Sequence, residues 1–135
     1  MDTNAIDRGE ENIATPEECV MMLKLLHIGK PSSWVAEKVL NILGKPKKGL
    51  LNSAIPLGLA VANKPGGMDR VRCDSGIVYL PNRPYAIAVM TSFGMGEPLS
   101  QEKFVIDVAK TVHQTLAVLD STNDYGLAAP ISTPR

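Results

Sequence analysis

The sequence predicts an α+β fold, in which a three-stranded antiparallel meander follows a helical hairpin and a closing helix packs on the sheet. Three observations predict it. Two capped stretches of helical period occupy the first third of the chain. Three short strand-like runs separated by turns follow them. A long stretch with one regular apolar stripe comes last.

The first helix is expected from Thr15 to about Ile28. Thr15 can cap its N-terminus, Pro16 suits the first helical position, and Glu18 completes a capping box. Gly29 is expected to end it. The helix carries two apolar stripes, which predict burial on both sides. One consists of Cys19, Met22, Leu23 and Leu26, and the other of Met21, Leu25 and Ile28.

The second helix is expected from Ser32 or Ser33, either of which can cap it, to Leu43. Trp34 begins this helix and is expected to pack. The short turn at residues 29–31 makes the two helices a hairpin. Glycines and prolines break any long element over residues 44–58, where a loop with at most one turn at residues 50–54 is expected.

Three strands are expected over residues 59–64, 71–80 and 85–93, the last two joined by a tight turn at residues 81–84. The third strand alternates large and small side chains. Small residues allow a helix to approach closely, so the sheet is expected to be covered on both faces.

The closing helix is expected over residues 100–119, because an apolar stripe with helical period begins at Val105. His113 is expected on the solvent-exposed side of this helix. Residues 1–14 are expected to be an irregular leader and residues 120–135 a flexible tail. Residues 1–119 therefore form one domain, or part of one.

Composition excludes several classes of function. The 135 residues carry 14 basic and 14 acidic side chains, and 4% are aromatic, so nucleic-acid binding is not expected. No apolar run approaches the roughly 18 residues of a membrane span. The N-terminus does not resemble a signal peptide, which favours the cytoplasm. Cys19 and Cys73 are either two free thiols or a disulfide, and two cysteines do not make a metal site. No metal or cofactor is expected.

The stretch Val61-Ala62-Asn63-Lys64-Pro65-Gly66-Gly67, followed by Cys73-Asp74-Ser75-Gly76-Ile77-Val78-Tyr79, resembles a known family. It is similar to the Lys-Thr/Ser-Gly strand and the following meander of class A serine β-lactamases and related penicillin-recognising hydrolases. Residues 5–16 are similar to the segment after the active-site omega loop of that family. The ordered set of motifs covers residues 1–119.

The resemblance implies a substrate-binding set in this chain. Lys64 would attract a substrate carboxylate, and Gly66 would leave room for substrate beside the backbone. The N–H of Gly67 would be one of two oxyanion-hole donors. Arg72 would offer a second cation. No catalytic set is complete, because the Ser-x-x-Lys nucleophile, the Ser-x-Asn motif and the omega-loop glutamate of the family belong to a region upstream of these residues.

Several residues depart from the family pattern or only mimic it. Pro65 replaces the usual Thr or Ser and removes a hydroxyl and an N–H. Ser100 to Lys103 spells Ser-x-x-Lys, but a helix-capping serine explains it better. Residues 121–123 spell Ser-x-Asn by chance. Asp74 is expected to be a structural hydrogen-bonding group. Neither His27 nor His113 has a partner that indicates catalysis.

The favoured interpretation is the C-terminal portion of a serine β-lactamase-like hydrolase, which performs acyl transfer on β-lactams or D-Ala-D-Ala-type amides. Its ligand would be a β-lactam or a peptidoglycan-like peptide. Its partner would be a complementary N-terminal subdomain, without which it would be inactive, so its status as an enzyme stays open. The alternative is a non-catalytic binding or assembly module that self-associates through the exposed sheet. A truncated reading frame without a function is a third interpretation.

Overall fold

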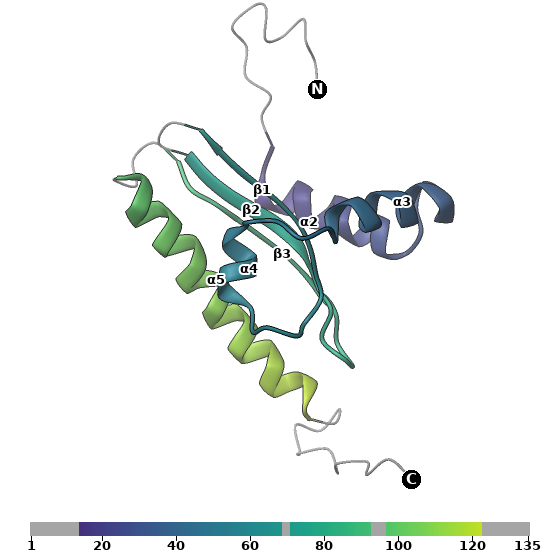
Figure 1. The fold of residues 1–135 in the computed structure, drawn as a ribbon. Helices are drawn as coiled ribbons and strands as arrows, with labels where there is room; N and C mark the ends of the chain where they lie inside the picture. The colour runs from purple at the N-terminus through teal and green to yellow at the C-terminus, as the bar shows by residue number, and fades with distance from the viewer. Residues whose placement is uncertain (1–13, 69–70, 93–96, 123–135) are drawn as a thin grey trace, which may run out of the picture.

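The computed structural model of the chain describes residues 14–68, 71–92 and 97–122. Its elements run in the order α2 (Pro16–His27), α3 (Ser33–Leu43), α4 (Leu50–Ala54), β1 (Val61–Met68), β2 (Val71–Val78), β3 (Tyr85–Met90) and α5 (Pro98–Asp120) (Figure 1). Most of the expected leader, the expected end of the third strand at Phe93 and the expected tail beyond Thr122 lie outside the described residues.

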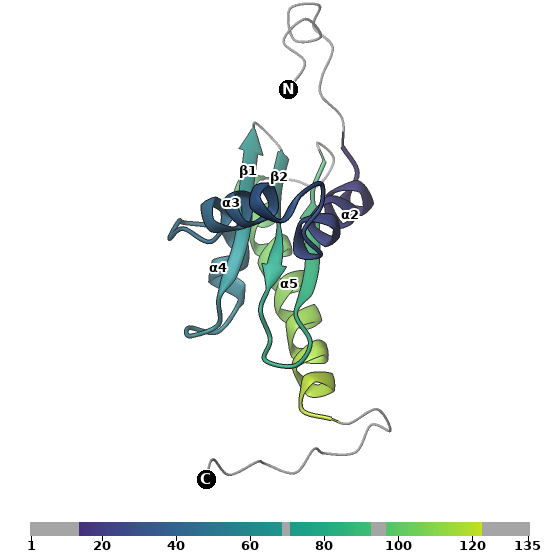
Figure 2. The ribbon, with the colours of Figure 1, turned by 90° about the vertical axis from the view of Figure 1, so that its right-hand side faces the viewer.

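The three strands form an antiparallel sheet in the order β1-β2-β3, which confirms the predicted meander and the α+β fold. Helices α4 and α5 pack together against one face of the sheet, and the hairpin of α2 and α3 packs against the other (Figures 1 and 2). Within the described residues, no helix is long and apolar enough to cross a membrane.

The main core lies between the sheet and the pair α4 and α5. Leu51 of α4, Val78 of β2 and Val105 of α5 are completely buried there, and Ile87 and Val89 of β3 complete the layer. Burial of such a side chain stabilises the fold by about 1.5–3 kcal/mol. This core fixes α4, and with it the loop that enters α4, against the sheet.

Both predicted helix starts of the hairpin are confirmed. The backbone N–H of Thr15 donates to Glu18 Oε2 at 2.8 Å, and the N–H of Glu18 donates to Thr15 Oγ1 at 3.2 Å, which completes the capping box. The bonds that the exposed Glu18 carboxylate accepts from the Thr15 backbone N–H and, at 3.0 Å, from the Thr15 hydroxyl lower the pKa of this group. Ser32 rather than Ser33 caps α3, through a bond from the N–H of Val35.

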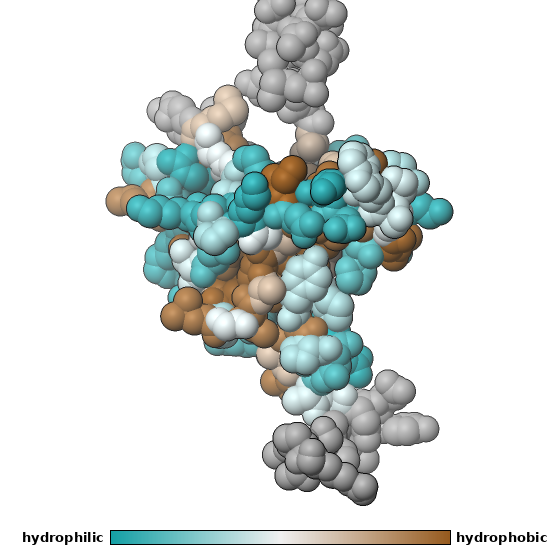
Figure 3. Space-filling view, turned by 45° about the vertical axis from the view of Figure 1, so that its right-hand side comes forward, coloured by the Kyte–Doolittle hydropathy of each residue, from teal (hydrophilic) through white to brown (hydrophobic). Residues whose placement is uncertain are grey.

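Two expectations about exposure in the helical hairpin are wrong. The second stripe of α2 remains exposed, because the sheet covers only the side of the helix that carries Leu23 and Leu26. Trp34 is 67% exposed rather than packed. On the face drawn in Figure 3, hydrophobic residues are visible among hydrophilic ones.

Two expectations about α5 are also wrong. The helix begins at Pro98, so Ser100 lies inside the first turn and does not cap it. His113 is buried rather than exposed to solvent, because β3 faces it and the Tyr85 hydroxyl lies 3.0 Å from His113 Nδ1.

The strand bounds differ from the expected ones as well. Strand β1 continues past Lys64 to Met68, because Gly66 and Gly67 pair with Cys73 and Arg72 of β2.

Candidate functional site

A buried polar cluster joins β1 and β2 to the start of α4. Asp74 is fully buried, and its Oδ2 accepts a hydrogen bond from the backbone N–H of Leu51 at 2.9 Å. Asn63 Nδ2 donates to both carboxylate oxygens at 3.0 Å and to Asn52 Oδ1 at 3.0 Å. Asn63 Oδ1 is buried without a hydrogen-bond partner among the described residues. The expected structural role of Asp74 agrees with these contacts.

Burial raises the pKa of the Asp74 carboxyl above its ordinary value, against the opposing effect of the bonds from Leu51 and Asn63. Gly49, the residue before α4, carries no side chain that could cap this helix. Asp74 therefore supplies the acceptor that an N-cap side chain supplies elsewhere.

Along the outer edge of β1, backbone N–H and carbonyl groups point away from β2. Arg72 bonds towards β3, because its N–H donates to Thr91 Oγ1 and its carbonyl accepts from the N–H of Thr91, both at 2.8 Å. In an antiparallel ladder both backbone groups of a residue point the same way, so Arg72 makes no ladder bond with its β1 partner Gly67. The N–H of Gly67 therefore points out of the sheet.

The same alternation explains how a proline fits in β1. Pro65 is two positions before Gly67 and also faces outward, so its missing N–H costs no ladder bond. The hydroxyl and N–H that the family pattern would place here are absent without harm to the sheet.

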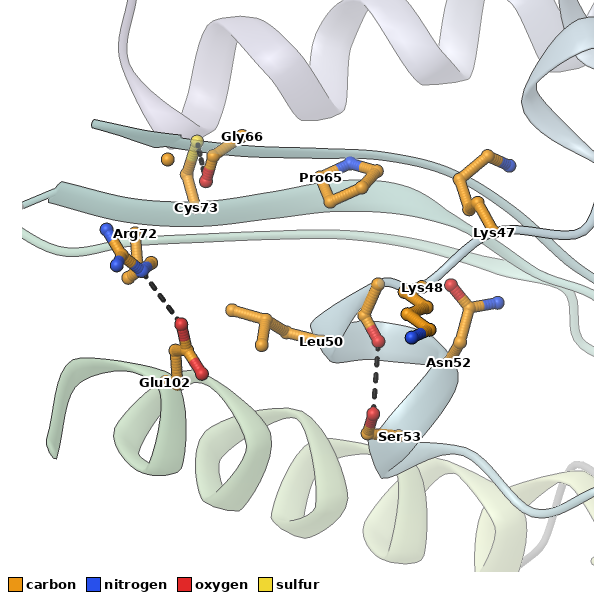
Figure 4. Close-up of a pocket in the computed structure, with 12 residues that line it drawn as sticks. Lys47, Lys48, Leu50, Asn52, Ser53, Pro65, Gly66, Arg72, Cys73 and Glu102 are labelled. Carbon is orange, nitrogen blue, oxygen red and sulfur yellow. Dashed lines mark hydrogen bonds and ion pairs between the residues drawn. The ribbon is translucent and has the colours of Figure 1, made fainter. Parts of the chain in front are cut away.

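A cavity of about 680 Å³ opens between this strand end, the loop before α4 and the first turns of α5 (Figure 4). Three segments line it, and their residues are Lys47, Lys48, Gly49, Leu50, Asn52 and Ser53; Pro65, Gly66, Gly67, Arg72 and Cys73; and Glu102. Three of the four residues predicted to bind substrate, namely Gly66, Gly67 and Arg72, are thus brought together in one cavity.

Arg72 is already engaged inside the cavity. Its Nε donates to Glu102 Oε1 at 2.9 Å, and its Nη1 donates to the carbonyls of Met68 at 2.6 Å and Val71 at 2.9 Å. The guanidinium is held rigidly, and Glu102 neutralises its charge. A ligand carboxylate would compete with Glu102 for this cation.

Cys73 is among the residues that line the cavity, and its thiol donates to the carbonyl of Gly66 at 3.4 Å. Burial raises its pKa above the ordinary value, and the charge of Asp74 acts in the same direction. The thiol therefore stays protonated near neutral pH and is not an activated nucleophile. Cys19 and Cys73 are both free in this structure.

Lys64 lies on the other face of the strand. Asn63 points to α4, and neighbouring side chains of a strand point to opposite faces, so Lys64 points to the side of α2 and α3. It is exposed, and its Nζ donates to the carbonyl of Pro65 at 2.6 Å. It does not line the cavity. A role for Lys64 in binding substrate stays a prediction.

Several cavity residues escaped the sequence reasoning. Lys47, Lys48, Asn52 and Ser53 lie in the segment expected to be a loop, and Glu102 lies near the start of the expected closing helix. The adjacent lysines before Gly49 were the available signal, since neighbouring cations raise the local concentration of anions.

The two histidines lie outside this cavity. His113 contacts Tyr85, and the ring of His27 lies 6.4 Å from that of Tyr79. The described part of the chain holds no cluster of three side chains that could bind a metal ion.

A family model and several solved structures match this chain. The model of a family described as the β-lactamase enzyme family matches residues 1–116. No curated protein matches significantly. The solved structure of TLA-3 extended-spectrum β-lactamase is similar, with a TM-score of 0.70 and 29% identity over 77% of this chain.

Two further structures share the fold. A β-lactamase from Sphaerobacter thermophilus DSM 20745 has a TM-score of 0.73 and 22% identity over 80% of this chain. PBP-A has a TM-score of 0.69 and 20% identity over 82%. In each of the three comparisons the chain spans only 42% of the length of the solved chain.

Proposed function

The chain belongs to the β-lactamase enzyme family, and from this premise we propose that it forms one wall of an acyl-transfer site for β-lactams or D-Ala-D-Ala-type amides. The observation that carries the proposal is the meeting of Gly66, Gly67 and Arg72 in one cavity. The outward N–H of Gly67 would hold a developing oxyanion, a contribution of about 3 kcal/mol to the transition state. The charged wall of the cavity would hold the carboxylate.

The attacking serine and the base that activates it would come from a complementary portion of the fold. The solved relatives are more than twice as long as the matched region, which supports such a portion. Lys64 projects from the face of the sheet that carries α2 and α3, and in this proposal it meets the complementary portion there and supports proton movement in the completed site.

The proposal predicts binding without turnover by the 135-residue chain. Millimolar benzylpenicillin should shift the NMR amide signals of Gly66, Gly67 and Arg72, because recognition needs no serine. Nitrocefin should not be hydrolysed, and a fluorescent penicillin should not label the chain covalently. Unchanged cavity signals at saturating benzylpenicillin, or clear covalent labelling, would refute the proposal.

A second candidate function is a non-catalytic assembly module. The exposed apolar side chains of α2 favour it, since Met21, Met22 and Ile28 are each more than half exposed. The solution mass of the chain separates the two candidates. A stable homodimer at micromolar concentration that dissociates in a Met22→Glu variant favours the module, whereas a monomer argues against it.

A further inference from the structure

We propose that Lys48 is the cation by which the cavity recognises the anionic group of its ligand. The proposal rests on the proposed function only for the identity of that group, a carboxylate. Lys48 lines the cavity from the loop before α4, on the side opposite β1 (Figure 4).

The charges in the cavity wall single out this lysine. Three cations, Lys47, Lys48 and Arg72, and one carboxylate, Glu102, line the cavity, which leaves a formal surplus of two positive charges. Glu102 neutralises Arg72. Lys47 Nζ donates to the carbonyl of Leu43, and in Figure 4 its amine points away from the other labelled side chains. Within the described residues, Lys48 makes no hydrogen bond or ion pair.

The backbone beside Lys48 is held in place. Gly49 is buried, and a Cβ built there would lie 2.6 Å from Asn63 Nδ2 and 3.0 Å from Asp74 Oδ2. The main chain at this point is therefore packed tightly against the polar cluster, while the lysine side chain is exposed. A fixed backbone lowers the entropy cost of placing the ammonium on a ligand.

Asn52 lines the same cavity and offers a second donor. Asn52 Oδ1 is occupied by the bond from Asn63 Nδ2, which turns the amide of Asn52 so that its NH₂ group is the end left for a ligand. Pro65 lines the cavity with neither a hydroxyl nor an N–H. The anion would therefore be recognised by the loop before α4 and not by position 65 of β1.

The test measures benzylpenicillin binding by NMR titration of the full chain and its variants. Lys48→Gln should weaken binding about three- to tenfold, and Lys48→Arg should keep it within twofold, because a charge rather than a shape is required. Lys45→Gln is the matched control: Lys45 is exposed in the same loop but does not line the cavity, so its loss should change the affinity by less than twofold. The methyl ester of benzylpenicillin should bind wild type and Lys48→Gln equally.

A second titration uses inorganic phosphate, which shares only its negative charge with benzylpenicillin. If benzylpenicillin binds wild type and Lys48→Gln equally, the role of Lys48 is wrong and the proposed function stands. If benzylpenicillin fails to bind but phosphate shifts the amides of Lys48 and Asn52 in wild type and not in Lys48→Gln, the role of Lys48 stands and the proposed function fails. If neither ligand binds, both proposals fail. Thermal unfolding of each variant confirms that it folds.

Discussion

The carboxylate of Asp74 on β2 accepts a 2.9 Å hydrogen bond from the backbone N–H of Leu51, in the first turn of α4. A helix of five residues is too short to be stable alone, so its position depends on such tertiary contacts. This bond and the burial of Leu51 in the core place the loop with Lys47 and Lys48 along the cavity.

Replacement of Gly49 by alanine should destabilise the fold by about 2–3 kcal/mol. The added Cβ would lie 2.5 Å from Asn52 Oδ1 and 2.6 Å from Asn63 Nδ2, and neither amide can retreat without breaking a buried hydrogen bond. Urea unfolding measures the change. The control Lys48→Ala, at the exposed neighbouring position, should cost less than about 0.5 kcal/mol. Equal stability of the two variants would contradict the tight packing at Gly49.

Asp74 should make stability depend on pH in a direction opposite to that of most carboxylates. Burial raises its pKa in the folded state above the ordinary value of 3.8, so the folded state holds the proton more tightly than the unfolded state. This contribution to stability is complete below pH 3.8 and is lost as the pH rises through the raised pKa.

Asp74→Asn should lose this dependence, because the amide does not titrate. The difference in unfolding free energy between Asp74→Asn and wild type should therefore shift in favour of the variant as the pH rises from about 4 towards neutrality. Urea unfolding at a series of pH values measures it. A difference that stays constant over that range would show that the Asp74 pKa is not raised.

Removal of the Glu102 carboxylate should strengthen anion binding in the cavity. Glu102→Gln frees the Arg72 guanidinium from its ion pair and raises the net positive charge of the wall. We expect a three- to tenfold tighter complex with benzylpenicillin, with stability changed by less than about 1 kcal/mol because the pair is partly exposed. Asp107→Asn is the control, since Asp107 pairs with Lys103 one turn further along α5 and does not line the cavity. Weaker binding in Glu102→Gln would mean that Arg72 needs Glu102 to be positioned.

The contact between Tyr85 and His113 should contribute one ordinary hydrogen bond to stability. Burial raises the pKa of the Tyr85 phenol to about 12, so the hydroxyl remains neutral over the whole physiological range. Tyr85→Phe should cost about 1 kcal/mol in urea unfolding. Tyr79→Phe is the matched control, because the Tyr79 hydroxyl has no hydrogen-bond partner within the described residues, and it should cost less. An unchanged unfolding free energy in Tyr85→Phe would contradict a net contribution from this hydrogen bond.

Part of the fold could be predicted from the sequence, because it depends on contacts between residues that are close together in the chain. The capping box of Thr15 and Glu18, the proline at the start of α2 and the Ser32 cap involve residues three or four positions apart, so their geometry follows from spacing alone. The strand runs and their short turns predicted the meander in the same way. Of the four residues that the resemblance assigned to substrate binding, Gly66, Gly67 and Arg72 share one cavity and Lys64 does not line it.

Contacts between distant segments determined the rest of the fold and of the site, because the burial of a side chain depends on which element packs against its face of the helix or strand. The pattern of α2 showed two apolar stripes, but the sheet covers only the side of the helix with Leu23 and Leu26 and leaves Met21 and Met22 exposed. His113 is buried because β3 happens to face it. The sequence placed Lys64 beside Gly66, yet the alternation of the strand directs the lysine to one face while the cavity opens on the other. Only the tertiary structure brings Lys48 and Glu102, more than fifty residues apart in the chain, to the same cavity wall.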